Sequence, residues 1–275
     1  MKVRHGREIQ PLDNQVNSDQ SLTPKLPFSM SVIGSKGASK TTTILNLLLS
    51  KDLLNNKFNE IFVISPTASL DSKWSVLKES KILAINKPLI NAYKKHSNIK
   101  KILDSKTDNK EQQEYNQELD DSNYITTPSL EFLKDLIKQQ QHVINEFGKN
   151  IANTILLIYD DCISNKKFFN SEIVRGCLFN SRHYKISIII TTQSYFSIPK
   201  PIRLNASILL IYYTGNVKEL KMVYEENSSG IDFKDFYKIY LDTCNLKPFH
   251  FLNIDYQNDI KHRLISGFEN FILDD

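Results

Sequence analysis

The feature that most constrains this chain is an apolar run that leads straight into a small glycine-containing turn and then into a helical pattern. Residues 28–33 form the run, and residues 42–54 carry apolar side chains at helical spacing. Small residues let the backbone curl, so that successive N–H groups point at one ligand, and the following helix adds its positive dipole end. This order predicts a phosphate-binding P-loop.

The turn holds nearly all the predicted nucleotide-binding residues, which are Gly34, Ser35, Lys36, Gly37, Ala38, Ser39, Lys40, Thr41 and Thr42. We expect Lys40 to reach the β- and γ-phosphates of ATP as a catalytic group, and the hydroxyl of Thr41 to bind Mg²⁺. The strict motif has Gly where Ser39 stands, so a left-handed backbone there would cost about 1 kcal/mol or more. The alternative is an ordinary strand–turn–helix connection.

Two adjacent carboxylates, Asp160 and Asp161, end another apolar run at 154–159. Buried acids are costly unless a positive group meets them, and Mg²⁺ would be such a group. We therefore predict that Asp160 binds the Mg²⁺ ion, either directly or through one of the ligands of the ion. We predict that Asp161 is the catalytic residue that orients the attacking water. The alternative is a solvated strand end or a helix cap.

A third apolar run, residues 186–191, ends in the polar series Thr191, Thr192 and Gln193. In P-loop proteins with an additional strand, this strand lies between the P-loop strand and the acidic strand. We therefore expect Gln193 to lie beside the γ-phosphate and to act in catalysis. An ordinary strand-to-loop transition is the alternative.

Arginine is scarce, and three of the six arginines lie between positions 175 and 203. Arg182, at the end of a predicted helix, is the candidate arginine finger, which would stabilise phosphate charge in the site of a neighbouring subunit. Arg203 and Arg175 are rivals for this role. For each of them a salt bridge or a contact with DNA phosphate remains open.

Near-continuous apolar runs that alternate with helical segments predict an α/β fold with a parallel sheet covered on both faces. The specific prediction is a three-layer αβα P-loop NTPase of the additional-strand, RecA-like type, with a mostly parallel central sheet. Thr127 and Pro128 predict the start of a helix that ends at Gly148, and the apolar residues of one face are Leu130, Leu133, Ile137 and Ile144. The other expected strands are 60–65, 206–213 and 249–254. The other expected helices are 171–182 and one or two helices within 216–244.

The chain divides into a polar, flexible N-terminal arm at 1–26 and a P-loop ATPase domain at 27–275, with a polar insertion at about 86–123. We see no apolar run long enough to span a membrane and no signal peptide. Three cysteines, Cys162, Cys177 and Cys244, suit buried positions in a reducing compartment better than a metal site or a disulfide. A net charge of +4 permits a polyanionic partner without requiring one.

Four segments in this order resemble the poxvirus-type genome-packaging ATPases of large DNA viruses and virophages, within the FtsK–HerA superfamily of P-loop NTPases. The segments are VIGSKGASKT, IFVISPTASLDSKW, ILLIYDD and FNSRHYKISIIITTQSYFSIPKPIRLNA. The resemblance covers roughly residues 28–227. Its most specific part has six residues at family positions, which are Arg182, His183, Gln193, Pro199, Arg203 and Asn205. Ser39 departs from the family pattern, and the insertion is poorly matched.

The resemblance implies an ATP- and Mg²⁺-dependent motor that drives double-stranded DNA into a preformed capsid. It implies a homo-oligomeric ring, a pentamer or a hexamer, with capsid or portal-vertex proteins as partners. It also implies a place in the host cytoplasm, at the viral factory, or association with the virion.

Two other functions remain open from the residues. One is a non-hydrolysing P-loop scaffold for virion assembly, which Ser39 and Asp161 favour. The other is a small-molecule kinase, against which the scarcity of arginine outside 175–203 argues. Turnover measured with and without DNA separates the three functions.

Overall fold

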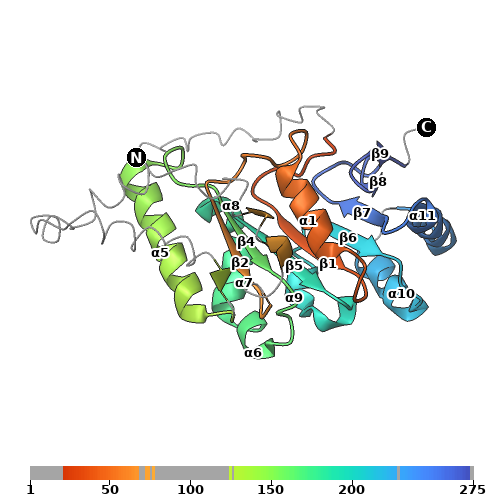
Figure 1. Cartoon of the computed structure of the whole chain (residues 1–275), viewed down its shortest axis with the longest axis horizontal. Coiled ribbons are helices and arrows are strands. Elements are labelled where there is room, and N and C mark those ends of the chain that lie inside the picture. The colour runs from red at the N-terminus through yellow and green to blue at the C-terminus, as the bar shows by residue number, and fades with distance from the viewer. Residues whose placement is uncertain are drawn as a thin grey trace, which may run out of the picture.

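One nine-stranded sheet organises the chain in the computed structural model, which describes residues 21–67, 72–74, 76–77, 124–125, 127–227 and 230–272 (Figure 1). The predicted insertion at 86–123 and most of the predicted arm lie outside these residues. The strands are β1 (Ser29–Ile33), β2 (Glu60–Ile64), β3 (Tyr124–Ile125), β4 (Ile155–Tyr159), β5 (Ile186–Thr192), β6 (Ile208–Tyr212), β7 (Phe251–Asp255), β8 (Leu264–Ser266) and β9 (Asn270–Phe271).

The strand order is β3-β2-β4-β5-β1-β6-β7-β8-β9. Pairing is parallel from β3 to β6 and antiparallel from β6 to β9. The prediction of a mostly parallel sheet is confirmed. Strand β5 lies between β1 and β4, as the additional-strand topology requires.

The register brings the polar strand ends to one edge of the sheet. Ile33 of β1 pairs with Thr192 of β5, and Tyr159 of β4 pairs with Ile190. The turn after β1, the acidic pair after β4 and the residues after β5 therefore leave the sheet side by side. In open α/β sheets, ligands bind at this carboxyl edge.

Helices cover both faces, which confirms the three-layer prediction (Figure 1). On one face, α1 (Lys40–Leu49) and the short η2 (Ser72–Trp74) pack on the sheet through Ile44, Leu48 and Trp74. The other helices are α5 (Leu130–Phe147), α6 (Lys166–Phe169), α7 (Glu172–Phe179), α8 (Ser181–Tyr184), η5 (Tyr195–Ser197), α9 (Lys200–Arg203), α10 (Val217–Glu226) and α11 (Phe233–Asn245). Buried residues of α5, α7, α10 and α11 belong to the core on the opposite face.

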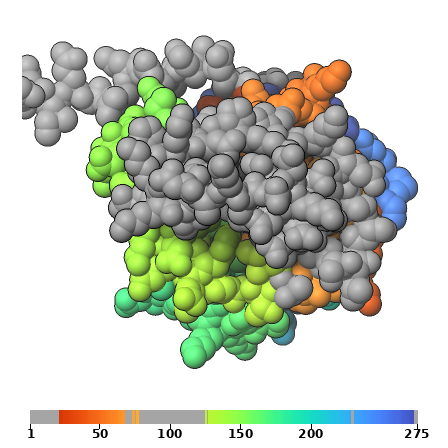
Figure 2. Space-filling model, turned by 60° about the vertical axis from the view of Figure 1, so that its left-hand side comes forward, coloured from red at the N-terminus to blue at the C-terminus, as the bar shows by residue number. Residues whose placement is uncertain are grey.

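Helix α5 corrects the predicted start at Thr127. Its N-cap is Ser129, whose side chain accepts a hydrogen bond from the N–H of Phe132 at 3.2 Å. Its buried residues are Leu133, Leu136, Gln140 and Val143. The predicted Leu130 and Ile137 are partly buried and pack against the same core as Leu133, whereas Ile144 is partly buried and is not among the core residues. The predicted end at Gly148 is confirmed. Figure 2 shows the outer side of α5 (yellow-green) at the surface.

Several other boundaries differ from the prediction. Helix α1 runs from Lys40 to Leu49 rather than over 42–54, because the P-loop continues directly into the helix. The expected helix 171–182 is two helices, α7 and α8, separated at Asn180, whose backbone is not helical (ψ 16°). Strands β3, β8 and β9 were not predicted, because two- and three-residue strands carry too few residues to show alternation.

The last residues of the predicted arm contact the domain. The backbone of Lys25 exchanges two hydrogen bonds with the side chain of Gln257, at 2.8 Å and 2.7 Å, and Thr23 donates to the carbonyl of Asp52. The three cysteines are free and buried, as predicted. Among the described residues, no helix is both long and apolar enough to cross a bilayer.

Candidate nucleotide-binding site

The turn between β1 and α1 has the backbone of a tight anion-binding loop. A Cβ at Gly34 would lie 2.9 Å from the Cβ atoms of both Ala38 and Tyr212, so only glycine fits there. Gly37 and Ser39 are both left-handed, with φ of 83° and 70°. The left-handed requirement considered at Ser39 is therefore present, and its hydroxyl makes no capping hydrogen bond that would offset the strain.

Lys40 is the first residue of α1 and is buried, with 7% of its surface exposed. Its ammonium donates to the carbonyl oxygens of Gly34 at 2.8 Å and Ser35 at 3.3 Å, so it lies within the curl of the loop. The backbone N–H of Thr43 donates to the carbonyl of Ser39 at 2.9 Å and begins the helix. The loop and the first turn of α1 thus hold a cation and a helix N-terminus together.

The acidic pair is fixed to the neighbouring strand by one hydroxyl. Thr191 of β5 donates to the Oδ1 atom of Asp160 at 2.6 Å and accepts the N–H of Asp161 at 2.9 Å. Asp160 is 6% exposed, whereas Asp161 is exposed and left-handed, with φ of 51°. The two carboxylates therefore have different environments, one enclosed and one open to solvent.

Burial raises the pKa of Asp160 above its ordinary value. The hydrogen bond from Thr191 lowers this pKa, the negative charge of Asp161 raises it, and the positive charge of Lys40 lowers it. The influence of Lys40 means that the acidic pair and the loop cation lie within electrostatic reach. The carboxylate is costly in the absence of a ligand, and a bound cation would remove this cost.

Gln193 follows the last residue of β5 and has an exposed side chain. It lines an open pocket of about 220 Å³ together with Asp161, Ile163, Ser164, Thr192, Ser194 and Ser197. The carbonyl of Thr192 also accepts the N–H of Gly34 at 3.1 Å, which ties this strand end to the start of the P-loop. The structure thus brings Lys40, Asp160, Asp161 and Gln193 to one edge of the sheet.

The oxygen donors at this edge suit magnesium. Thr41 lies in the first turn of α1 and Asp160 ends β4, and hydroxyl and carboxylate oxygens are the ligands that Mg²⁺ takes. No group of three or more His, Cys, Asp or Glu side chains gathers in the described part of the chain. An ion at this edge would therefore depend on nucleotide phosphates and water for its other ligands.

The three candidate arginines lie in different settings. Arg182 is exposed on α8, which precedes the amino end of β5, so the seven-residue strand places it on the order of 20 Å from the P-loop edge. Arg203 is 9% exposed and binds Glu226 through two hydrogen bonds of 2.8 Å and 2.7 Å. Arg175 donates to the carbonyl of Asn170 at 3.1 Å. None of the three lies among the residues that line the 220 Å³ pocket.

A larger hollow of about 410 Å³ lies away from this edge. It is formed by residues 21 and 23–26 together with 51–54 and 57, after the C-terminal end of α1. It contains none of the predicted site residues. Its walls include Lys25, Lys51 and Lys57, which are exposed.

Two side chains that organise the site were not predicted from the sequence. The hydroxyl of Thr191 bonds both acidic residues, whereas the sequence predicted only that Thr191 lies near the end of a strand. Tyr212, at the end of β6, packs against Gly34 and forms a short hydrogen bond with Thr43. Both residues lie at the end of an apolar strand that neighbours the P-loop strand, and a polar residue in that position is the sequence pattern that could have predicted them.

No protein-family model matches the chain. Uncharacterized protein 075L of Invertebrate iridescent virus 6 is 31% identical over 111 residues, which are 40% of this chain and 42% of that protein. Uncharacterized protein L437 of Acanthamoeba polyphaga mimivirus is 27% identical over 106 residues, which are 36% of this chain and 37% of that protein. The matches thus span less than half the length of these relatives, both of which are proteins of large DNA viruses.

The genome packaging NTPase B204 of Sulfolobus turreted icosahedral virus 2, solved in complex with AMP, is similar in structure. The superposition has a TM-score of 0.52 at 15% sequence identity and covers 85% of this chain and 95% of that chain. An identity this low establishes the fold alone. The chain therefore has the fold of a viral genome packaging NTPase, as the resemblance implied.

Proposed function

We propose that this chain is an ATPase that drives viral double-stranded DNA into a capsid in the host cytoplasm. In this proposal it works as a homo-oligomeric ring, with DNA and capsid or portal-vertex proteins as partners. The observation that carries the proposal is the convergence of Lys40, Asp160, Asp161 and Gln193 at the carboxyl edge of the sheet. The fold of a packaging NTPase and the relatives in large DNA viruses support the choice of substrate.

ATP bound with Mg²⁺ would supply a phosphoryl group whose charge the metal partly neutralises. Lys40 would exchange the carbonyl oxygens of Gly34 and Ser35 for phosphate oxygens, because an ammonium prefers anionic acceptors. The backbone N–H groups of the loop would hold the same phosphates. Thr41 and Asp160 would hold the metal.

Asp161 is the group placed to orient the attacking water. It is exposed, lines the same pocket as Gln193, and is held through its backbone N–H by Thr191. A carboxylate in this position accepts a proton from water and aims its lone pair, while the amide of Gln193 contacts the water or the γ-phosphate. The pocket of about 220 Å³ leaves room for a water molecule between them.

An arginine from a neighbouring subunit would complete the site. Arg182 suits this role better than Arg203, because it is exposed and the guanidinium of Arg203 is engaged by Glu226. Its distance from the site of its own subunit means that it would act only across a ring interface. Such a guanidinium stabilises the charge of the transferring phosphoryl group.

Steady-state ATP hydrolysis, with and without linear double-stranded DNA, tests the proposal. We expect DNA-stimulated turnover in the wild-type protein and its loss, by about 100-fold or more, in Lys40→Ala and Asp161→Asn. The matched control is Lys51→Ala, an exposed lysine just after the opposite end of α1, which should keep wild-type turnover. Turnover that survives in Lys40→Ala would assign the activity to a contaminant.

A second candidate function is a virion assembly scaffold that does not hydrolyse ATP. The strained left-handed Ser39 and the short Asp161 carboxylate favour it, because both depart from the usual residues of a strict hydrolase. A folded, assembled wild-type protein without turnover under any condition would select this function over the motor.

A further inference from the structure

Glu219 is a buried carboxylate that the proposed chemistry does not use. It lies in the first turn of α10 and is 5% exposed. Among the residues that the structure describes, it forms no ion pair within 4.0 Å. A buried carboxylate without a cation requires several hydrogen-bond donors.

Three donors converge on one oxygen of this carboxylate, Oε1. The hydroxyl of Ser194 donates at 2.6 Å, the backbone N–H of Tyr195 donates through a very short hydrogen bond, and the N–H of Phe196 donates at 3.4 Å. These residues directly follow Gln193. Glu219 therefore holds the backbone on the C-terminal side of Gln193 from a helix that lies more than twenty residues further along the chain.

The N-terminal side of Gln193 is held as well. The carbonyl of Thr192 accepts the N–H of Gly34 at 3.1 Å, so this side is attached to the P-loop. The hydroxyl of Thr192 contacts Oγ of Ser197 at 2.6 Å and accepts the N–H of Ser194 at 3.3 Å. Gln193 is thus an exposed side chain between two fixed points of backbone.

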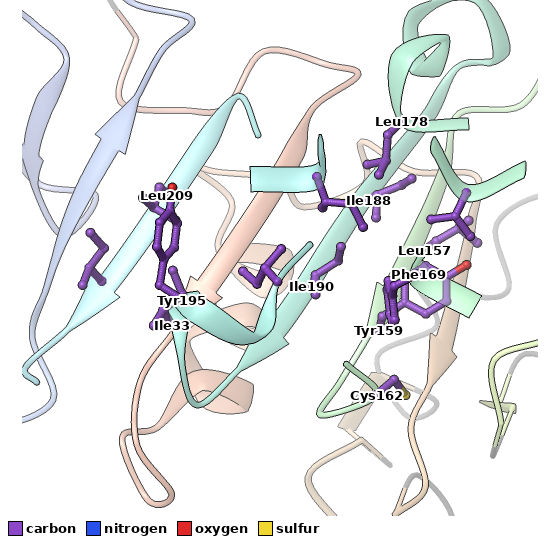
Figure 3. Close-up of a cluster of buried hydrophobic side chains, with 14 of the residues drawn as sticks. Ile33, Leu157, Tyr159, Cys162, Phe169, Leu178, Ile188, Ile190, Tyr195 and Leu209 are labelled. Atoms are coloured by element: carbon purple, nitrogen blue, oxygen red, sulfur yellow. The ribbon is translucent and has the colours of Figure 1, made fainter. Parts of the chain in front are cut away.

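Tyr195 anchors the same turn in the core. Figure 3 shows its ring beside Leu209 and close to Ile33, the last residue of the P-loop strand. Its hydroxyl donates to Glu226 at 2.9 Å, and the guanidinium of Arg203 lies 5.0 Å from its ring centroid. Both ends of α10, through Glu219 and Glu226, therefore hold the turn that carries Gln193.

We propose that Glu219 is the positioning residue that aims Gln193 into the pocket of Asp161, and that α10 is thereby coupled to events at the γ-phosphate. This inference rests on the proposed ATPase function. Without the carboxylate, the buried N–H of Tyr195 and the partly buried N–H of Phe196 lose their acceptor, so the turn shifts to find another. A displacement of about 1 Å at a group that orients a reactant costs on the order of 100-fold in rate.

The test separates positioning from binding through kcat and KM for ATP. We expect Glu219→Ala to lower kcat by about 10- to 100-fold while KM for ATP changes by less than about threefold. Glu219→Gln should restore kcat to within about threefold of wild type, because all three donors use a single oxygen that glutamine also has.

A double-mutant cycle ties the effect to Gln193. Gln193→Ala should lower kcat to a similar extent, and Gln193→Ala with Glu219→Ala should be no slower than Gln193→Ala alone, because the second change has nothing left to misplace. The control is Glu225→Ala on the same helix, an exposed carboxylate that should leave kcat unchanged. If Glu219→Ala does not fold, Ser194→Ala removes one of the three donors and should lower kcat by about threefold at constant KM.

Three results would overturn the inference: an unchanged kcat in folded Glu219→Ala, effects of Gln193→Ala and Glu219→Ala that multiply, or a Glu219→Gln variant as slow as Glu219→Ala. Each of these, with normal wild-type turnover that Lys40→Ala abolishes, refutes the positioning role alone. Absence of turnover in the wild-type protein would refute the proposed function and this inference with it.

Discussion

Two clusters of this molecule contain a buried or largely buried carboxylate, and they differ in how its negative charge is compensated. At the P-loop edge, Asp160 is buried beside Asp161, and its hydrogen-bond partner is the neutral Thr191. Beside α10, Arg203 and Glu226 form an ion pair of 2.7 Å, and the carbonyl of Ile198 takes a further donor of the guanidinium at 2.8 Å. In the described part of the chain Asp160 forms no direct ion pair, although the charge of Lys40 reaches it, whereas Glu226 is paired directly with Arg203.

The pKa values follow this difference. Burial raises the pKa of Asp160, whereas the hydrogen bonds from Arg203 hold the pKa of Glu226 below its ordinary value. Two of the five left-handed non-glycine residues in the described part of the chain, Ser39 and Asp161, lie at the P-loop edge, and none of the five belongs to the Arg203–Glu226 pair. Charge and strain that the fold does not resolve are expected where a ligand binds, and a fully paired cluster is expected where the fold needs support.

Asp160→Asn is the strongest test of the contrast between the two clusters. We expect ATP turnover to fall by about 100-fold or more, because the metal loses a carboxylate, and the free energy of unfolding without ligand to rise by about 1 kcal/mol. The amide oxygen still accepts the hydroxyl of Thr191, while the amide NH2 replaces the second carboxylate oxygen, so the variant removes the buried charge and exchanges one acceptor for a donor. Hydrolysis assays and urea unfolding measure the two effects.

Asp161→Asn is the control for Asp160→Asn. Asp161 is exposed, so its change should abolish turnover yet leave the free energy of unfolding within about 0.5 kcal/mol of wild type. A loss of stability in Asp160→Asn would mean that the carboxylate is already compensated, and the contrast between the two clusters would fail.

Arg203→Ala tests the paired cluster. We expect the free energy of unfolding to fall by about 3 kcal/mol, because Glu226 keeps the hydroxyl of Tyr195 but loses its ion-pair partner in a largely buried place, and the carbonyl of Ile198 loses a donor. Arg203→Lys should not restore it, since an ammonium cannot make this forked set of hydrogen bonds. Denaturant unfolding measures both variants.

Exposed Arg182 provides the comparison for Arg203. Arg182→Ala should stay within about 0.5 kcal/mol of wild type in unfolding free energy while turnover of the assembled protein falls. If instead Arg203→Ala abolished turnover at unchanged stability, Arg203 would be the arginine that acts between subunits.

A third buried carboxylate, Asp255, allows the cost of a buried charge to be measured as a pH dependence of stability. Asp255, at the end of β7, is 2% exposed, and burial raises its pKa from 3.8 to about 6, although the N–H of Gln257 donates to it at 2.8 Å. The folded state therefore binds its proton more tightly than the unfolded state, and this contribution to stability is lost as pH rises from about 4 to about 6. Asp255→Asn should stabilise the protein by about 1 to 2 kcal/mol above pH 7 and by much less at pH 4.

Urea unfolding of wild type and Asp255→Asn at several pH values measures this difference, and the comparison cancels the titration of all other groups. A difference that does not depend on pH would mean that Asp255 keeps an ordinary pKa. In that case the negative charge of Asp255 would be stabilised by more than the hydrogen bond from Gln257 and the charge of the nearby Lys25.

The P-loop edge was largely predictable from the sequence, and the cluster beside α10 was not. The P-loop, Asp160 and Gln193 each follow an apolar run, and they need only the parallel topology to converge, because parallel strands put their carboxyl ends at one edge. Glu219 and Glu226 contact residues 23 to 31 positions away, through a crossing of helices that no local pattern specifies. Long-range side-chain pairs of this kind are set by packing.

Local ambiguity explains the smaller errors. Thr127 and Ser129 are both good N-cap residues two positions apart, and the structure selects Ser129; Leu133 and Leu136 of the helix that follows lie in the core. The break at Asn180 between α7 and α8 was missed because Ser171 to Arg182 has enough apolar residues for one helix. Such choices differ by a few tenths of a kcal/mol locally and are decided by the core.

The smallest expected effect is that of Ser39→Gly, which tests whether the left-handed backbone at the P-loop edge destabilises the protein. Glycine adopts φ of 70° without the penalty of a Cβ, but it also gains freedom in the unfolded chain, so we expect a net gain of about 0.5 kcal/mol in unfolding free energy. Turnover should not fall, because the hydroxyl makes no capping hydrogen bond and the carbonyl that accepts from Thr43 is kept. Ser39→Ala is the matched control, since it removes the hydroxyl but keeps the Cβ and should gain nothing. If Ser39→Gly lowered turnover and Ser39→Ala did the same, the hydroxyl itself would contact the nucleotide, and the departure from the strict motif would be a functional adaptation of this loop.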